Sequence, residues 1–171
     1  MRIKQLYFLT FLFFLNHSQA QVTFQKTFGS TGPDYATDVI QTADKGYAVM
    51  GVMNFGGVYI LKTDSLGNKQ WSKNFGIYTP SMGEFRAFAQ TSDGGFILAG
   101  HVYYSSNYYG FTIKTDAAGN ITWSKMHVAT GRIHSIKQTI EGDYIAVGNG
   151  NLFQNKGVLI RFSSTGNMIW S

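Results

Sequence analysis

Few side chains in this sequence could carry out chemistry, and they do not form a catalytic set. Three histidines follow residue 20, His101, His127 and His134, and none has a second histidine at a metal-ligand spacing such as H-x-x-x-H. His127 occupies a position that Phe28 and Phe75 hold in similar segments, which indicates a packing or surface role. The sequence has no nucleophile elbow, phosphate loop or paired-carboxylate motif. We therefore predict no catalytic residues, no metal site and no cofactor.

Acidic residues recur beside glycine, which at first suggests a metal or phosphate loop. They lie in the segments DKG (44–46), DGG (93–95) and EGD (141–143). The alternating ligands and terminal Glu of a calcium loop are missing, so turn chemistry explains these acids. Asp64 is expected to cap a turn in the same way, with Gly67 and Asn68 supplying its backbone geometry.

These acidic residues and glycines belong to a unit that is repeated along the chain. A first segment occurs three times, as QTADKGYAVMG (41–51), QTSDGGFILAG (90–100) and QTIEGDYIAVG (138–148). A second follows each copy, as YILKTDSLGNKQW (59–71), FTIKTDAAGNITW (111–123) and VLIRFSSTGNMIW (158–170). The repeat places a tryptophan and a glycine at equivalent positions, namely Trp71, Trp123 and Trp170 with Gly67, Gly119 and Gly166. A period near 50 residues is typical of arrays of similar supersecondary units.

Each unit is expected to form four short antiparallel strands. In the middle unit these are residues 84–90, 96–103, 111–116 and 121–126. SDGG (92–95) is expected to form a tight primed turn, because Gly tolerates positive φ. Segments such as FILAG are apolar without alternation, as in strands covered on both faces.

We therefore predict an all-β protein, a β-propeller-like array of about three four-stranded antiparallel blades. A β-sandwich or barrel is the alternative, although neither requires a faithful repeat with tryptophans in phase. The expected domains are a signal peptide (1–20) and a repeat region (21–171), with blades at about 30–76, 77–127 and 128–171. FQKTFG (24–29) resembles WSKNFG (71–76), so residues 22–29 are expected to form a lone outer strand.

The first twenty residues have the order of a secretory signal peptide. Arg2 and Lys4 precede an apolar run at 6–15, and Ser18 and Ala20 occupy the −3 and −1 positions of a cleavage site. Ten apolar residues are too few for a membrane span, which needs about 20. We expect a secreted or cell-surface protein with no membrane span after cleavage.

Charge and cysteine content narrow the function classes further. Without Arg2 and Lys4 the chain has 12 basic and 9 acidic residues, a net charge of +3. The basic residues are scattered, so a nucleic-acid partner is not expected. The chain has no Cys, which excludes thiol chemistry and disulfides.

Three blades are fewer than the four to eight of closed propellers, and would leave two apolar sheet faces uncovered. We expect further blades of the same protein, as in the N-terminal part of a longer chain, or a homodimer of three and three blades, to cover these faces.

The phrases QTSDGGFILAG and IKTDAAGNITWSK resemble the repeats of secreted, propeller-like proteins of Bacteroidota-type bacteria. The resemblance covers nearly all of residues 22–171. It implies secretion, often by the type IX route with a C-terminal sorting domain, and it implies no activity. The D-x-x-G-N-x-x-W spacing is also similar to the tryptophan-docking repeats of quinoprotein-type propellers, which implies that each Trp packs between blades. The third copy departs from this pattern at Phe162 and Ser163.

One stretch, HVYYSSNYYG (101–110), interrupts the repeat and is expected to be a loop between the second and third strands of the middle blade. It carries four tyrosines, Tyr103, Tyr104, Tyr108 and Tyr109. Tyrosine is rigid and amphipathic, so these residues suit contacts with a glycan or a protein. Packing at the blade edge is the alternative.

The sequence favours a secreted or cell-surface module with a binding or structural role. The alternative is the non-catalytic portion of a secreted glycan-active hydrolase or lyase whose active site lies outside this chain.

Overall fold

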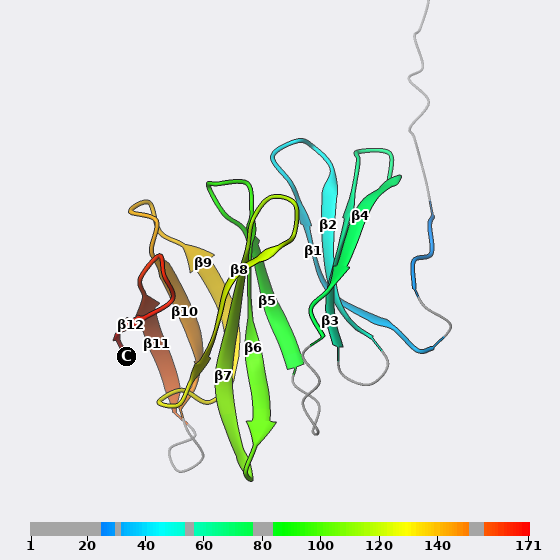
Figure 1. The fold of residues 1–171 in the computed structure, drawn as a ribbon. Coiled ribbons are helices and arrows are strands. Elements are labelled where there is room, and N and C mark those ends of the chain that lie inside the picture. The colour runs from blue at the N-terminus through cyan, green and yellow to red at the C-terminus, as the bar shows by residue number, and fades with distance from the viewer. Residues whose placement is uncertain (1–24, 30–31, 54–56, 77–83, 151–155) are drawn as a thin grey trace, which may run out of the picture.

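The computed structural model describes residues 25–29, 32–53, 57–76, 84–150 and 156–171. All regular structure in these ranges is β-strand (Figure 1). The strands are β1 (Tyr35–Gln41), β2 (Tyr47–Met53), β3 (Gly57–Thr63), β4 (Lys69–Asn74), β5 (Glu84–Gln90), β6 (Phe96–Tyr104), β7 (Asn107–Thr115), β8 (Ile121–His127), β9 (Ile133–Gln138), β10 (Tyr144–Asn149), β11 (Gly157–Phe162) and β12 (Met168–Trp170). Among the described residues, no helix is long and apolar enough to span a bilayer.

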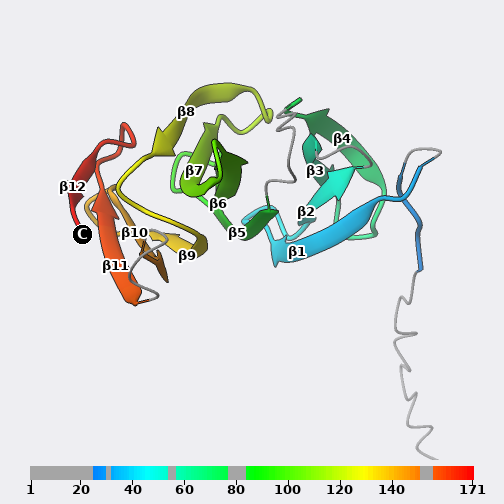
Figure 2. The same cartoon turned by 90° about the horizontal axis from the view of Figure 1, so that it is seen from below.

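The strands form three antiparallel sheets, each a simple up-and-down meander of four neighbours in sequence. Sheet 1 contains β1–β4, sheet 2 contains β5–β8 and sheet 3 contains β9–β12. The sheets stand face to face along an arc, with β1, β5 and β9 on its inner side and β4, β8 and β12 on its outer side (Figure 2). The predicted all-β, propeller-like array of three four-stranded sheets is confirmed, and the described residues form an open arc.

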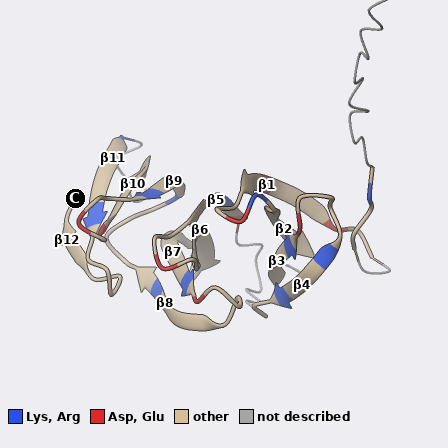
Figure 3. Cartoon of the chain, turned by 90° about the horizontal axis from the view of Figure 1, so that it is seen from above, with Lys and Arg blue, Asp and Glu red and all other residues tan. Residues whose placement is uncertain are grey.

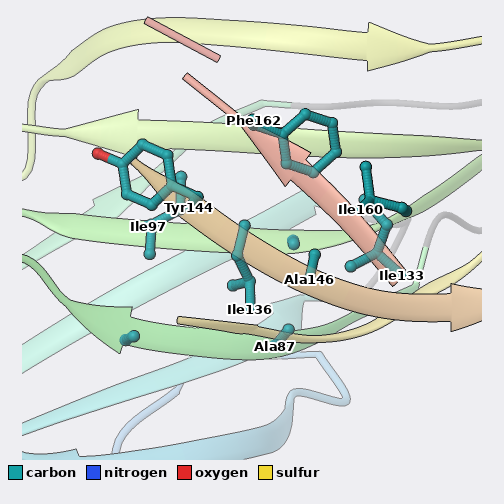
Figure 4. Packing of buried hydrophobic residues seen from close by; sticks show 10 residues of the cluster. Ala87, Ile97, Ile133, Ile136, Tyr144, Ala146, Ile160 and Phe162 are labelled. Atoms are coloured by element: carbon teal, nitrogen blue, oxygen red, sulfur yellow. The ribbon is translucent and has the colours of Figure 1, made fainter. Parts of the chain in front are cut away.

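The apolar core lies between the sheets. Sheets 1 and 2 enclose one cluster, which includes Met50, Ile60, Phe88, Phe96 and Leu98. Sheets 2 and 3 enclose a second cluster, which includes Ile97, Ile136, Tyr144, Ile160 and Phe162 (Figure 4). The adjacent residues Ile97 and Leu98 belong to different clusters, because successive side chains of a strand point to opposite faces. Sheet 2 is therefore covered on both faces, which explains the unbroken apolar segment FILAG.

The first hairpin of each sheet turns differently from the expectation. Gly94 N donates to Thr91 O, and Gly94 is the one residue of SDGG with positive φ, at 80°. A single left-handed residue after two right-handed ones is a type I turn with a following bulge, whereas a type I′ turn has two left-handed residues. Asp93 accepts bonds from Thr91 Oγ1 and Gly95 N, which holds the turn in this form.

Two further expectations differ from the structure. Residues 25–29, the described part of the expected outer strand at 22–29, form no strand. Residues 101–110 are not a loop, because β6 and β7 continue through them as a hairpin. The expected signal peptide lies outside the described residues.

Candidate functional site

The motif around Asp64 forms a turn rather than a ligand site. Asp64 Oδ1 accepts bonds from the backbone N–H groups of Leu66 and Asn68 at 2.9 and 2.8 Å, and Asn68 Nδ2 donates to its other oxygen. Gly67 has a φ of 74°, which a residue with a side chain rarely adopts. Hydrogen bonds from Asn68 lower the pKa of Asp64. Asp64 therefore caps a turn, as expected from the sequence.

The repeated Trp and Gly residues meet across neighbouring sheets. The ring of Trp71 packs edge-on against Phe96 of sheet 2, with ring centroids 5.9 Å apart. A Cβ atom on Gly119 would lie 2.8 Å from the same indole, so glycine is needed for the contact. Trp123 repeats the arrangement against sheet 3, where a Cβ atom on Gly166 would lie 2.6 Å from its ring. Trp170 is part of the last sheet and is exposed.

A lysine two residues after each of these Trp positions forms a second contact between units. The pairs are Lys73 with Asn120 and Lys125 with Asn167, each through Nζ and Oδ1. Lys26 makes the same bond to Asn68 of sheet 1. Residues 25–29 therefore lie against sheet 1 where the outer strand of a preceding unit would lie, although they form no strand themselves.

Sequence reasoning missed a third contact between units, made by the repeated glutamines. Gln90 Oε1 accepts a bond from Ala43 N at 2.8 Å, and Gln138 Oε1 accepts one from Ser92 N at the same distance. Each glutamine thus ties the inner strand of one sheet to the first turn of the sheet before it. The QT pair that begins each copy indicates that the glutamine matters to the repeat. It does not reveal the bonding partners, which lie more than 40 residues from each glutamine.

The acidic turns are paired with cations, of which Lys62 and Lys114 are buried and Arg161 is partly exposed. The pairs are Lys62 with Asp44, Lys114 with Asp93 and Arg161 with Asp143. The bond from Lys62 lowers the pKa of Asp44 to about 2. Burial acts to raise the pKa of Asp93, but the bonds from Lys114 and Thr91 outweigh it and bring the pKa to about 2. These carboxylates complete a structural ion pair, and the described residues contain no cluster of three metal-ligating groups.

Two of the three histidines, His101 and His127, are buried and act as packing residues. His127 is buried with its Nε2 2.9 Å from Thr112 Oγ1, and its ring lies 4.3 Å from that of Phe162. Burial lowers its pKa to about 4. His101 is also buried, and burial together with the charge of Arg132 lowers its pKa to about 4. His134 lies on sheet 3 and bonds with Asn149.

The four candidate tyrosines lie on the tip of the β6–β7 hairpin. Both strands have nine residues, against six or seven in the equivalent strands of sheets 1 and 3. Ser105 and Ser106 form the turn with φ angles of 47° and 65°, which is the pattern of a two-residue type I′ turn. The hairpin extends to the lower edge of the molecule in Figure 1.

The hairpin places the tyrosines on two opposite faces. Tyr103 and Tyr108 are directly paired across the strands, and their ring centroids lie 4.9 Å apart. Tyr104 and Tyr109 point to the other face, because neighbouring residues of a strand alternate. Tyr104 is 61% exposed and the other three are partly buried. The structure therefore does not bring all four rings into one platform.

An arginine that the sequence did not single out joins this hairpin. The guanidinium carbon of Arg132 lies 3.9 Å from the centre of the Tyr108 ring, which is a cation–π contact. The ring of His101 packs edge-on against Tyr108 as well, with ring centroids 5.1 Å apart. Arg132 has no equivalent among the repeated motifs, so the repeat gave no signal for it.

Two clefts accompany these features. One of 470 Å³ lies along the inner strands and is lined by Gln41, Gln90 and Gln138, among others. A second of 530 Å³ lies between residues 26–28 and sheet 1, and is lined mainly by apolar residues such as Val49 and Leu61. In the first cleft, Gln90 and Gln138 already bond to the neighbouring sheet. The second cleft lies on the uncovered end of sheet 1.

The comparisons with known proteins support the fold alone. No protein-family model matches the sequence, and none of the curated proteins does. The fold is similar to a crystal structure of a protein of unknown function from Bacteroides caccae, with a TM-score of 0.50 and 14% identity. The match covers 84% of this chain and 68% of that one.

Proposed function

We propose that this chain is a secreted or cell-surface binding module, in which stacked propeller-like sheets hold the β6–β7 hairpin as a recognition surface. One observation carries the proposal. The hairpin is the longest in the described residues, and four tyrosines flank the two-serine turn at its tip. Tyrosine gives large contact areas at low entropic cost, and Tyr104 is largely exposed.

The arrangement of the sheets supports a recognition role for the tip. The Trp, Lys and Gln contacts between sheets fix the base of the hairpin, so little conformational entropy is lost when a ligand binds to it. Lys and Arg residues are scattered over the three sheets in Figure 3, which supports a ligand other than a nucleic acid. Export is part of the proposal, and it rests on the order of charged, apolar and small residues in the first twenty positions.

The proposal includes a partner for the ends of the arc. Val147, Leu159 and Trp170 are exposed on sheet 3, at positions whose counterparts in sheets 1 and 2 pack against the next sheet. A second copy of the chain would cover this face by apolar packing of sheet on sheet, as between sheets 1 and 2 and between sheets 2 and 3. Light scattering across a range of concentrations tests this part, since a monomer at every concentration would contradict it.

The recognition role is tested with an array of glycans and extracellular proteins. We expect binding by the wild-type chain and its loss in Tyr104→Ala, because Tyr104 is exposed and makes none of the ring contacts that join the other tyrosines. Tyr35→Ala is the matched control, because Tyr35 is 67% exposed on β1 and lies on a different sheet. Equal binding by Y104A and the wild-type chain would count against the Tyr104 face of the hairpin as the recognition surface and would leave only the opposite face, with Tyr103 and Tyr108, as a candidate.

A further inference from the structure

Arg132 is held against the tyrosine hairpin from a different sheet. It directly precedes β9 of sheet 3, whereas Tyr108 belongs to β7 of sheet 2. The guanidinium lies 3.9 Å over the Tyr108 ring, and Tyr103 packs on the same ring. The cation is therefore fixed beside the tip by stacking rather than by a carboxylate.

The guanidinium of Arg132 lacks an anionic partner in the described residues. Of the three arginines in these ranges, Arg86 pairs with Glu84 and Arg161 pairs with Asp143. Arg132 makes no ion pair there, and its Nε is shielded from solvent without an acceptor. The shielded Nε has a cost for the fold, but a ligand cannot reach it. The two terminal nitrogens of the guanidinium are not among the shielded donors, so they are the ones that an anion can reach.

The charged groups near Arg132 include the carboxylate of Glu84, but that carboxylate is paired with Arg86, which leaves the charge of Arg132 uncompensated. His101 lies on the same face of the hairpin, and the positive charge of Arg132 is one cause of its lowered pKa, after burial. His134 contributes in the same direction, while Glu84 acts in the opposite direction and is already paired with Arg86. An added carboxylate would compensate this charge.

We propose that Arg132, stacked on Tyr108, binds the carboxylate of an acidic saccharide whose sugar ring lies against Tyr103, on the same face of the hairpin tip. The inference rests on the proposed recognition role of the hairpin and adds the class of ligand. A uronic acid combines a sugar ring, whose apolar C–H face can pack on the partly exposed ring of Tyr103, with a carboxylate that matches the planar fork of arginine. An acidic peptide supplies the carboxylate without the sugar ring.

The experiment compares oligogalacturonate with its methyl ester by calorimetry. We expect the wild-type chain to bind the acid at least about tenfold more tightly than the ester, since a charge-assisted bidentate bond is worth a factor of this size. Arg132→Gln should abolish this preference. Lys137→Gln is the matched control, because Lys137 is an exposed cation on β9, the strand that follows Arg132, and lines the cleft along the inner strands. It should keep the preference.

A second measurement needs no variant. Saturation of the wild-type chain with oligogalacturonate should raise the pKa of His101 in an NMR titration, because the bound carboxylate offsets the charge of Arg132. Equal binding of acid and ester, an unchanged His101 pKa, or tighter binding of oligoglutamate than of oligogalacturonate would each overturn the inference while leaving a recognition role for the hairpin. Failure to bind any saccharide or peptide would overturn the proposed function as well.

Discussion

Replacement of Gly119 by alanine tests the contact between Trp71 and the neighbouring sheet. The φ of Gly119 is 77°, and a left-handed conformation costs an alanine about 1–2 kcal/mol. The new methyl group would also lie 2.8 Å from the indole of Trp71 and 2.9 Å from Lys73 Cγ. Overpacking of this kind costs a further 1–3 kcal/mol or so. We therefore expect Gly119→Ala to lower the free energy of unfolding by about 2–5 kcal/mol.

Gly94→Ala supplies the matched control for this experiment. Gly94 has nearly the same φ, 80°, but its new Cβ would meet only the Cβ of Ala117, at an ordinary 3.5 Å. It should therefore cost only the backbone term of about 1–2 kcal/mol. Urea denaturation followed by circular dichroism measures both variants, with the slopes compared to check two-state behaviour. If the two substitutions destabilise the protein equally, Trp71 does not pack on Gly119 as described.

Two further predictions concern pH and the buried ion pairs. The pKa of His127 is about 4 when folded and about 6.5 when unfolded, so the unfolded chain binds more protons and stability falls as pH is lowered from 6.5 to 4. His127→Phe should reduce the fall in urea midpoint between pH 7 and 4.5, and an unchanged fall would contradict this assignment. Lys114→Met should raise the pKa of Asp93 from about 2, because burial then acts without the opposing cation. The stability that this carboxylate now loses between pH 4 and 2 should become smaller in K114M, where only the bonds from Thr91 and Gly95 still lower the pKa. A ¹³C NMR titration of Asp93 provides the check, and a pKa still near 2 would be inconsistent with the pair.

The sequence predicts the sheets well because the strands and turns depend mainly on residues that are close together in the chain. Short apolar runs between Gly-containing turns leave few alternatives, and three copies of the pattern reinforce one another. The middle copy shows where this reasoning fails. Ser105-Ser106 is not one of the usual residue pairs of a type I′ turn, so HVYYSSNYYG was interpreted as a loop although its strands continue to the turn.

The candidate site could be predicted only in part. The composition of the hairpin identifies its tyrosines, but the division of these rings between two faces follows from the pairing register of β6 and β7. Arg132 reaches Tyr108 from another sheet, and no local pattern encodes that contact. Likewise, the repeated glutamines mark the repeat in the sequence, whereas their bonds to the preceding sheet appear only when the sheets are stacked.

The most direct test of the recognition role is a map of ligand protection by hydrogen exchange. A glycan selected from the array is added to the wild-type chain, and exchange is compared with and without it. The account predicts protection at the tip of the β6–β7 hairpin and around Arg132, with little change elsewhere. Protection centred on the cleft at Gln41, Gln90 and Gln138, with none at the hairpin, would contradict it.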